Sequence, residues 1–247
     1  MTLTDKQRDR YIRHITLKEI GADGQQRLLN AKVLIVGVGG LGSPAALYLA
    51  ATGVGTIGIM DGDKIDISNL HRQILYTTDD VGKQKVDAAK IRLESMNPDV
   101  KIIAIDERLS KSNAEQIVRD YDFVIDGCDN LPTKFLINDV CVKNKIAYSH
   151  AGITCLKGQT FTYTPGSTCL RCIFPDKTPP PPSCTRTGVL GALPGILGAI
   201  QAIEAIKFLT GMGELLTNKL LTCDSTTMEF RTIDLKRNSE CPFCFQN

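Results

Sequence analysis

A short apolar stretch that runs into a glycine-rich turn constrains the fold of this chain most. Residues 32–36 (Lys-Val-Leu-Ile-Val) are rich in branched aliphatic side chains and predict a buried parallel strand. The pattern Gly37-x-Gly39-x-x-Gly42 follows at once, and the apolar residues 43–52 predict a helix whose first turn accepts Pro44. Glycines let the backbone turn tightly and approach a ligand, and a helix N-terminus offers unpaired N–H groups. The stretch therefore predicts a nucleotide-binding turn.

An acidic residue stands where a ribose-binding group is expected. Asp61 closes the next predicted strand, residues 56–60, at roughly the twenty-residue spacing typical of such sites. A glycine turn and an acidic residue alone are most common in NAD(P)-dependent oxidoreductases. The turn is not a phosphate-wrapping P-loop, because Ser43-Pro44 occupies the place of the required Gly-Lys-Ser/Thr. If the ligand is ATP, cations for its phosphates must come from elsewhere in the chain.

The chain alternates strand and helix patterns up to residue 149 and then changes character. Such alternation predicts right-handed crossovers and a parallel sheet that is covered on both faces. Further on, alternating residues predict antiparallel strands. We therefore expect a single domain over 1–247 with a Rossmann-like doubly wound α/β fold. Its mainly parallel sheet is continued by antiparallel strands. Residues 30–150 form the nucleotide-binding half, and residues 151–247 form the second half. The predicted strands are 32–36, 56–60, 101–105, 122–126, 145–149, 157–164 and 218–235 with a turn at Asp224-Ser225; the predicted helices are 5–14, 43–52, 83–96, 112–119, 131–143 and 189–209; and 174–183 is a proline-rich exposed loop.

Composition narrows the class of partner. The 29 basic and 27 acidic residues nearly cancel, so no electrostatic reason favours nucleic acid or an anionic membrane as partner. Nine cysteines in a chain with a polar, charged N-terminus indicate reduced thiols, metal ligands or a catalytic thiol, and a cytoplasmic location. The apolar run 188–203 is shorter than a membrane span and contains Pro194, so a buried or subunit-facing helix is expected there.

Two C-x-x-C pairs predict a structural zinc site. Four thiolates suit a tetrahedral zinc ion, and residues 173–240 separate the pairs by far more than a zinc ribbon uses. The metal would therefore pin the C-terminal tail to the middle of the chain. The rival interpretation is a redox dithiol, which normally sits in a thioredoxin-like context that this chain lacks. The four predicted ligands are Cys169, Cys172, Cys241 and Cys244.

Cations and amides that the glycine turn lacks occur further along the chain. Arg72 and Lys85 can hold a triphosphate, and the amides of Asn69 and Gln73 can bind it or a partner's backbone, although the segment 68–73 is also compatible with an ordinary polar loop. Near the N-terminus, Arg10 and Arg13 lie one turn apart on one helix face, where they either face solvent or reach an anionic site.

A second acidic segment follows the strand 122–126. Asp129, after the strand end, suits Mg²⁺ that bridges phosphates. The alternative is a simple helix cap by Asp129 or Asn130, and Asn130 can cap the following helix in either case.

This combination resembles the ThiF/MoeB/HesA family, whose members are relatives of the ubiquitin-activating enzymes and adenylate small sulfur-carrier proteins. The resemblance runs in order and at family-like spacing from Arg10 to Cys244. It is carried by Arg10-Tyr-Ile-Arg13, Gly37 to Gly42, Asp61, Ser68-Asn-Leu-His-Arg-Gln73, Lys85, Asp129-Asn130 and the paired C-x-x-C motifs.

The resemblance implies ATP with Mg²⁺ on Asp129, a homodimer in which Arg13 reaches the neighbouring subunit's ATP site, and a ubiquitin-like sulfur-carrier partner ending in Gly-Gly. Asp61 would hold the ribose, and Gly40 would let the backbone approach it. The catalytic set would be Arg13, Arg72, Lys85, Asp129 and Cys184; the nucleotide-binding set would be Gly37, Gly39, Gly40, Gly42, Asp61, Ser68, Asn69, Arg72, Gln73, Lys85, Asp129 and Asn130.

Cys184 carries a separate expectation. In ThiF-like members a cysteine of the matching crossover loop bonds to the activated partner, whereas MoeB-like members do not need it for adenylation, and both roles stay open here. Because the chain ends soon after Cys244, we expect no fused rhodanese domain and a separate sulfur donor, such as a cysteine desulfurase or a rhodanese. The carrier belongs to thiamine, molybdopterin or another sulfur-carrier route, which the residues do not distinguish.

Two other functional classes account for less of the sequence than an adenylyltransferase does. An NAD(P)-dependent oxidoreductase accounts for the glycine turn and Asp61 but leaves Arg72, Asp129 and the cysteine pairs unexplained. A non-catalytic binding scaffold of the same fold is disfavoured because every residue needed to handle ATP is present.

Overall fold

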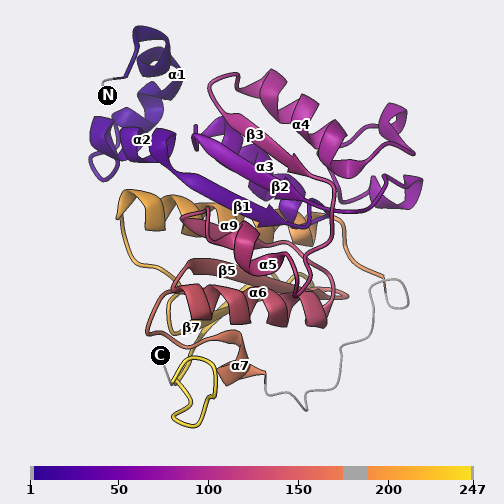
Figure 1. The fold of residues 1–247 in the computed structure, drawn as a ribbon, viewed down its shortest axis with the longest axis vertical. Coiled ribbons are helices and arrows are strands. Elements are labelled where there is room, and N and C mark those ends of the chain that lie inside the picture. The colour runs from indigo at the N-terminus through magenta and orange to yellow at the C-terminus, as the bar shows by residue number, and fades with distance from the viewer. Residues whose placement is uncertain (1–2, 175–187, 246–247) are drawn as a thin grey trace.

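The computed structural model describes residues 3–174 and 188–245, which build one eight-stranded sheet with helices on both faces (Figure 1). The strand order is β3-β2-β1-β4-β5-β6-β7-β8. Strands β3 to β5 along this order are parallel, and β5 to β8 are antiparallel, as predicted. The strands are β1 (Lys32–Val36), β2 (Thr56–Met60), β3 (Lys101–Ile105), β4 (Phe123–Asp126), β5 (Ala147–Thr154), β6 (Lys157–Tyr163), β7 (Lys219–Asp224) and β8 (Glu229–Asp234).

The predicted helices are present, and most of their ends differ from the prediction by a few residues. Two helices are additional to the prediction, α2 and the one-turn α7. The helices are α1 (Asp5–Ile15), α2 (Gly21–Asn30), α3 (Gly42–Ala51), α4 (Lys85–Met96), α5 (Ala114–Val118), α6 (Leu131–Asn144), α7 (Leu170–Ile173) and α9 (Ala192–Thr210). The proline-rich stretch from 175 onward and Cys184 lie outside the described residues.

The pleat of the parallel strands divides the core into two layers. Side chains of a strand alternate between faces, so Val33 and Ile35 of β1 join one apolar cluster while Leu34 and Val36 join the other. Helices α3, α4 and α9 cover the first face, and α5 and α6 cover the second (Figure 1). Burial on both faces explains why these strands are continuous apolar runs.

Helix α9 is the helix of the described residues that is long and apolar enough to cross a membrane by length and composition. In the fold it packs lengthwise against α3, β4, β5 and β6. Leu193, Leu197 and Ala205 are fully buried, and Gln201 and Glu204 are buried with hydrogen-bond partners. The helix therefore has the environment of a core helix, in agreement with the prediction of a buried helix.

Helix α2 (Gly21–Asn30) was missed because its sequence is a poor helix former by itself. It contains two glycines and begins without a side-chain cap. Tertiary packing compensates: Leu28 is fully buried in the core, and Gln25 donates to the Thr52 carbonyl oxygen at 2.9 Å. Helix formation here depends on α1 and α9 as neighbours.

Two glycines of the turn are required by close backbone contacts. Gly37 has φ +89°, a conformation that side-chain-bearing residues rarely adopt. A methyl group on Gly42 would lie 1.9 Å from the Gly37 carbonyl oxygen, so α3 can begin directly against the turn only with glycine at this position. Gly42 therefore shapes the turn through packing.

We predict that Gly42→Ala destabilises the protein by about 2 kcal/mol or more, because the clashing atom is backbone and cannot move aside cheaply. Urea unfolding of wild type and variant measures the difference. Gly195→Ala in α9 is the control: nothing lies within 4 Å of the added methyl group, so about 0.5–1 kcal/mol of stabilisation is expected there. Equal stability of wild type and Gly42→Ala would contradict the assigned packing role.

Candidate active site

A small cavity of about 160 Å³ lies at the carboxyl ends of β1, β2 and β4. This is the edge at which parallel α/β sheets bind their ligands. The cavity brings together most of the residues predicted for a nucleotide: Gly37, Gly39, Gly40, Asp61, Arg72, Gln73, Lys85, Asp129 and Asn130 all line it. Asp63, Glu107 and Arg108 also line it and were not predicted.

Asp61 holds the glycine turn in place. Its Oδ2 accepts a hydrogen bond from the backbone N–H of Val38 at 3.0 Å, and its Oδ1 accepts one from Asp63 at 3.0 Å. Burial raises the pKa of Asp61, and the nearby Lys85 ammonium opposes that rise. The carboxylate therefore depends on these donors, and it faces the cavity as a group that binds hydroxyls would.

Lys85 opens helix α4 and lies almost buried between two carboxylates. Its Nζ is 3.1 Å from Asp63 Oδ2 and 3.7 Å from Asp61 Oδ2. Asp63 also accepts from Arg108, whose side chain is 80% exposed. Burial alone would raise the pKa of Asp63, but Lys85 and Arg108 together hold it below its ordinary value. The charge of Lys85, which lines the cavity, is thus balanced by the carboxylates of Asp61 and Asp63.

In the segment 68–73, some side chains line the cavity and others form hydrogen bonds within the turn itself. Arg72 lines the cavity, with its Nη1 3.1 Å from the Ser68 carbonyl oxygen and 2.8 Å from His71 Nε2. Gln73 is buried, and its Oε1 has no hydrogen-bond partner among the described residues, which makes it a candidate ligand contact. The side chains of Ser68 and Asn69 bond to Asp66 and line neither this cavity nor the groove described below.

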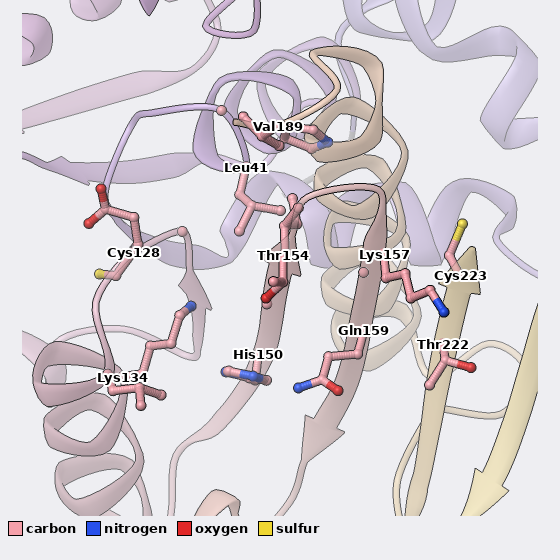
Figure 2. Close-up of a pocket in the computed structure, with 18 of the residues that line it drawn as sticks. Leu41, Cys128, Lys134, His150, Thr154, Lys157, Gln159, Val189, Thr222 and Cys223 are labelled. Carbon is pink, nitrogen blue, oxygen red and sulfur yellow. The ribbon is translucent and has the colours of Figure 1, made fainter. Parts of the chain in front are cut away.

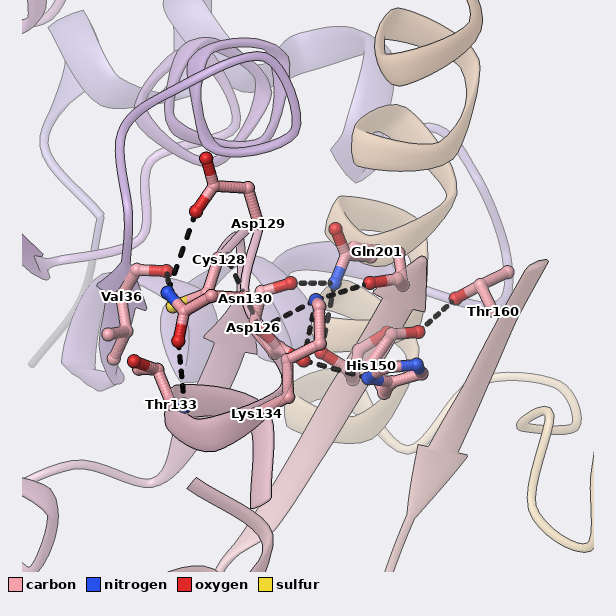
Figure 3. A network of polar contacts seen from close by, with 12 residues as sticks. Val36, Asp126, Cys128, Asp129, Asn130, Thr133, Lys134, His150, Thr160 and Gln201 are labelled. Atoms are coloured by element: carbon pink, nitrogen blue, oxygen red, sulfur yellow. Dashed lines mark hydrogen bonds and ion pairs between the residues drawn. The ribbon is translucent and has the colours of Figure 1, made fainter. Parts of the chain in front are cut away.

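The end of β4 carries a buried charged network (Figure 3). Asp126, completely buried, accepts hydrogen bonds from Lys134 Nζ at 3.1 Å and from His150 Nδ1 at 2.7 Å. Lys134 Nζ also donates to the Ala151 carbonyl oxygen at 2.6 Å. Burial works to raise the pKa of Asp126, but Lys134 and His150 hold it below its ordinary value. This network ties β4, β5 and α6 together.

Asp129 and Asn130 follow this network on the loop that leads into α6. Asn130 caps the helix, because its Oδ1 accepts from the Thr133 N–H at 3.0 Å, which confirms the predicted cap. Asp129 is exposed, and its Oδ1 lies 3.5 Å from the Asn130 Nδ2. Its carboxylate is therefore open to a cation, as the prediction of a magnesium ligand requires.

A second, larger cavity of about 800 Å³ adjoins the first and forms a groove over the antiparallel half of the sheet (Figure 2). Side chains of one face of β5 to β8 form its floor, in rows that follow the strand pairing. The two cavities share a rim made of Gly40, Arg72, Gly127, Cys128, Asp129 and Asn130. Whatever occupies the groove therefore meets the ligand of the small cavity at Arg72 and Asp129.

Arg13 and Gly42, like Ser68 and Asn69, line neither cavity, and Cys184 lies outside the described residues. Helix α1, which carries Arg13, lies beside the amino ends of the parallel strands (Figure 1). Within the described part of the chain Arg13 has no hydrogen bond or ion pair, whereas Arg10 donates to the Met96 carbonyl oxygen. Gly42 acts through packing against Gly37, and the covalent role of Cys184 stays a prediction.

The two C-x-x-C pairs converge into one cluster. The four sulfur atoms all lie within 4.8 Å of one another, with Sγ–Sγ distances of 3.9 Å (Cys169–Cys172), 3.7 Å (Cys169–Cys241) and 3.4 Å (Cys172–Cys244). Sulfur atoms 2.3 Å from a tetrahedral zinc ion lie about 3.8 Å apart. The donor set and its spacing thus fit zinc.

Arg171, which lies between Cys169 and Cys172 in the sequence, attaches the cysteine cluster to α6. Arg171 binds Asp139 with two nitrogens at 2.7 Å and lies over the rings of Phe135 and Phe243 at 4.6 and 4.2 Å. A stacked guanidinium with a bidentate carboxylate holds a fixed orientation. The C-terminal tail is therefore anchored to α6 through Arg171.

Comparisons with known proteins agree with this geometry. The sequence model of the ThiF family matches residues 11–243. A SAMP-activating enzyme E1 of Haloferax volcanii is 44% identical over 246 residues, covering 99% of this chain and 91% of the relative. A sulfur carrier protein adenylyltransferase of Thermus thermophilus is 42% identical over 253 residues, covering 99% and 93%. An adenylyltransferase and sulfurtransferase MOCS3-1 of Zea mays is 44% identical, but this chain spans only 52% of its length.

Solved structures extend the likeness to the fold. The crystal structure of E. coli MccB with ATP superposes with a TM-score of 0.83 at 26% identity, covering 98% of this chain and 75% of that one. The complex of E. coli MccB with MccA-N7isoASN gives 0.84 at 26% identity, with 96% and 74% covered. The mixed sheet is thus an architecture shared with these structures, and the family model and the relatives show that this chain belongs to the ThiF family.

Proposed function

We propose that this protein is a nucleotidyltransferase that adenylates the C-terminal glycine carboxylate of a ubiquitin-like sulfur-carrier protein of the ThiS or MoaD kind, releasing pyrophosphate. The observation that carries the proposal is the shared rim: a small cavity lined by phosphate- and ribose-type ligands opens, at Arg72 and Asp129, into a groove of about 800 Å³. A relative named sulfur carrier protein adenylyltransferase, a relative named adenylyltransferase and sulfurtransferase, and a MccB structure with ATP support it.

The chemistry requires few catalytic groups. A C-terminal carboxylate has a pKa of about 3.5 and is already ionised at neutral pH, so no general base is needed for its attack on the α-phosphorus. The enzyme has to hold the reactants in line and stabilise charge as pyrophosphate leaves. Arg72 and Lys85 suit that role, and Asp129 would hold Mg²⁺, which supplies further positive charge on the phosphates.

Nucleotide binding in this site involves an exchange of partners by Lys85. Its ammonium is paired with Asp63 and Asp61 at the cavity. A triphosphate can take over the ammonium while Arg108 continues to pair with Asp63. Asp61 keeps its backbone donors and offers its remaining lone pairs to ribose hydroxyls.

The two rival functions account for less of the site. An NAD(P)-dependent oxidoreductase needs no groove that meets the nucleotide cavity at an arginine and an exposed aspartate. A non-catalytic scaffold needs no cluster of Arg72, Lys85 and Asp129 around one cavity. Thiamine and molybdopterin routes both remain compatible with this site, and we expect a separate sulfur donor and action in the cytoplasm.

We predict that Lys85→Ala and Asp129→Ala each reduce ATP–pyrophosphate exchange by about 100-fold or more, because each removes charge stabilisation of the leaving phosphates. Exchange is measured with radiolabelled pyrophosphate and a ubiquitin-like carrier ending in Gly-Gly. Lys83→Ala is the matched control, since Lys83 belongs to the same segment but is exposed and pairs with Asp80. Full exchange activity in either site variant would remove its assigned role.

Arg13 is proposed to act in the partner subunit of a homodimer, since its helix α1 lies at the end of the sheet opposite the cavities (Figure 1). Arg13→Ala and Lys85→Ala dimers should each be inactive, but after subunit exchange the mixed dimers contain one intact site. Random exchange should then restore about a quarter of wild-type activity, because half of the dimers are mixed. Failure to regain activity in a mixture shown to exchange subunits would exclude action in trans.

The cysteine cluster is proposed to hold one structural zinc ion per chain. Burial and the neighbouring Cys172 raise the pKa of the Cys169 thiol, so four thiolates at this spacing require a cation. Metal analysis should find about one zinc per chain in wild type. Cys244→Ser should lose zinc and lower the melting temperature, whereas Cys155→Ser, a half-buried thiol outside the cluster, should retain it. A metal-free, fully stable wild type would refute the zinc site.

A further inference from the structure

Two polar side-chain ends converge over a glycine on the floor of the groove. His150 and Gly152 lie on β5, and Gln159, the cross-strand partner of Gly152, lies on β6. A methyl group placed on Gly152 would lie 3.7 Å from His150 Nε2 and 3.6 Å from Gln159 Nε2. Figure 2 shows the Gln159 amide directed toward the His150 ring. Both side chains line the groove, and neither of these nitrogens has a hydrogen-bond partner among the described residues.

The buried network fixes the hydrogen-bonding character of His150. Its Nδ1 lies 2.7 Å from the Asp126 carboxylate, which can only accept, so Nδ1 carries the proton. Burial lowers the pKa of His150, and the Lys134 ammonium acts in the same direction, whereas the hydrogen bond that His150 donates to Asp126 opposes them. The ring is therefore neutral at pH 7, and Nε2 presents a lone pair to the groove. Asp126 and Lys134 are the charged groups that act on the ring.

This pair is matched to one residue of an extended peptide. The N–H and C=O of a residue in an extended chain point to the same side, so an acceptor and a donor next to each other can bind both. Nε2 of His150 supplies the acceptor, and the side-chain amide of Gln159 supplies the donor. Gly152 leaves the floor between them free of a side chain, which lets a backbone approach closely.

We propose that His150 and Gln159 are positioning residues that bind the main chain of the carrier's C-terminal Gly-Gly segment and set the register in which its carboxylate reaches the nucleotide. This inference rests on the proposed adenylyltransferase function. It assigns Asp126 and Lys134 an indirect part, since they hold the His150 ring in the orientation and tautomer that binding requires.

The test uses pyrophosphate exchange with a semisynthetic ubiquitin-like carrier ending in Gly-Gly, measured in full-length wild type and in His150→Ala, His150→Gln and Gln159→Leu. Loss of one hydrogen bond should raise the KM for the carrier about 5- to 10-fold in His150→Ala and Gln159→Leu, while the KM for ATP is unchanged. His150→Gln, which can place an amide oxygen as acceptor, should recover part of the affinity. Thr160→Val is the control, because Thr160 donates to the His150 carbonyl oxygen from the other side of β6 and should leave the carrier KM unchanged (Figure 3).

A modified carrier separates direct contact from a general loss of structure. Carriers with N-methylglycine at the last or the penultimate position lack one tail N–H each. At the position that His150 binds, N-methylation should weaken binding to wild type and have no further effect on His150→Ala, because the two changes remove the same bond. Additive effects at both positions, or an unchanged carrier KM in His150→Ala and Gln159→Leu, would overturn the proposal. Absence of exchange in wild type with any carrier would instead overturn the adenylyltransferase function itself.

Discussion

The arrangement of this site depends on one buried carboxylate, that of Asp126. A fully buried charge must be paired, and here a single lysine from α6 and a histidine from β5 share it. The same lysine reaches the Ala151 carbonyl oxygen of β5, so the end of β4, helix α6 and the first antiparallel-paired strand are locked together. The loop that follows Asp126 forms the rim between the two cavities, and its position is fixed by this pairing.

The sheet changes from parallel to antiparallel pairing at β5, and this change separates two tasks. Parallel strands align their carboxyl ends, which gathers Asp61, Lys85 and the glycine turn at one edge around a small cavity. The antiparallel strands instead present a broad pleated face, and alternate residues of that face form the floor of the groove. One continuous sheet thereby sets a compact polar pocket beside an extended surface suited to a peptide.

Sequence patterns predicted the parts of this molecule that are encoded locally. The strands β1 to β4, the glycine turn, the cap by Asn130 and the start of α4 at Lys85 all follow from short-range periodicity and from residues at strand ends. Residues of the groove floor were not predicted, because Lys134, His150 and Gln159 come together only through strand pairing and helix packing. Asp63 could have been predicted as a site residue, since it stands two residues after the strand-end acid Asp61. Its pairing with Lys85 could not, because that contact depends on the tertiary structure. Helix α2 escaped prediction for the same reason, as its stability comes from neighbours and not from propensity.

The pairing of Lys85 with Asp61 and Asp63 affects how strongly phosphate and small organic acids can compete for this ammonium. An unpaired ammonium would attract any such anion, whereas one already paired with two carboxylates gains little from an anion that displaces it from Asp61 and leaves Asp63 to Arg108 alone. Only a molecule that brings hydroxyls and a counter-cation along with its phosphates replaces what the acids lose. The pairing of Lys85 with the chain's own carboxylates therefore favours a ligand of that kind over a simple anion.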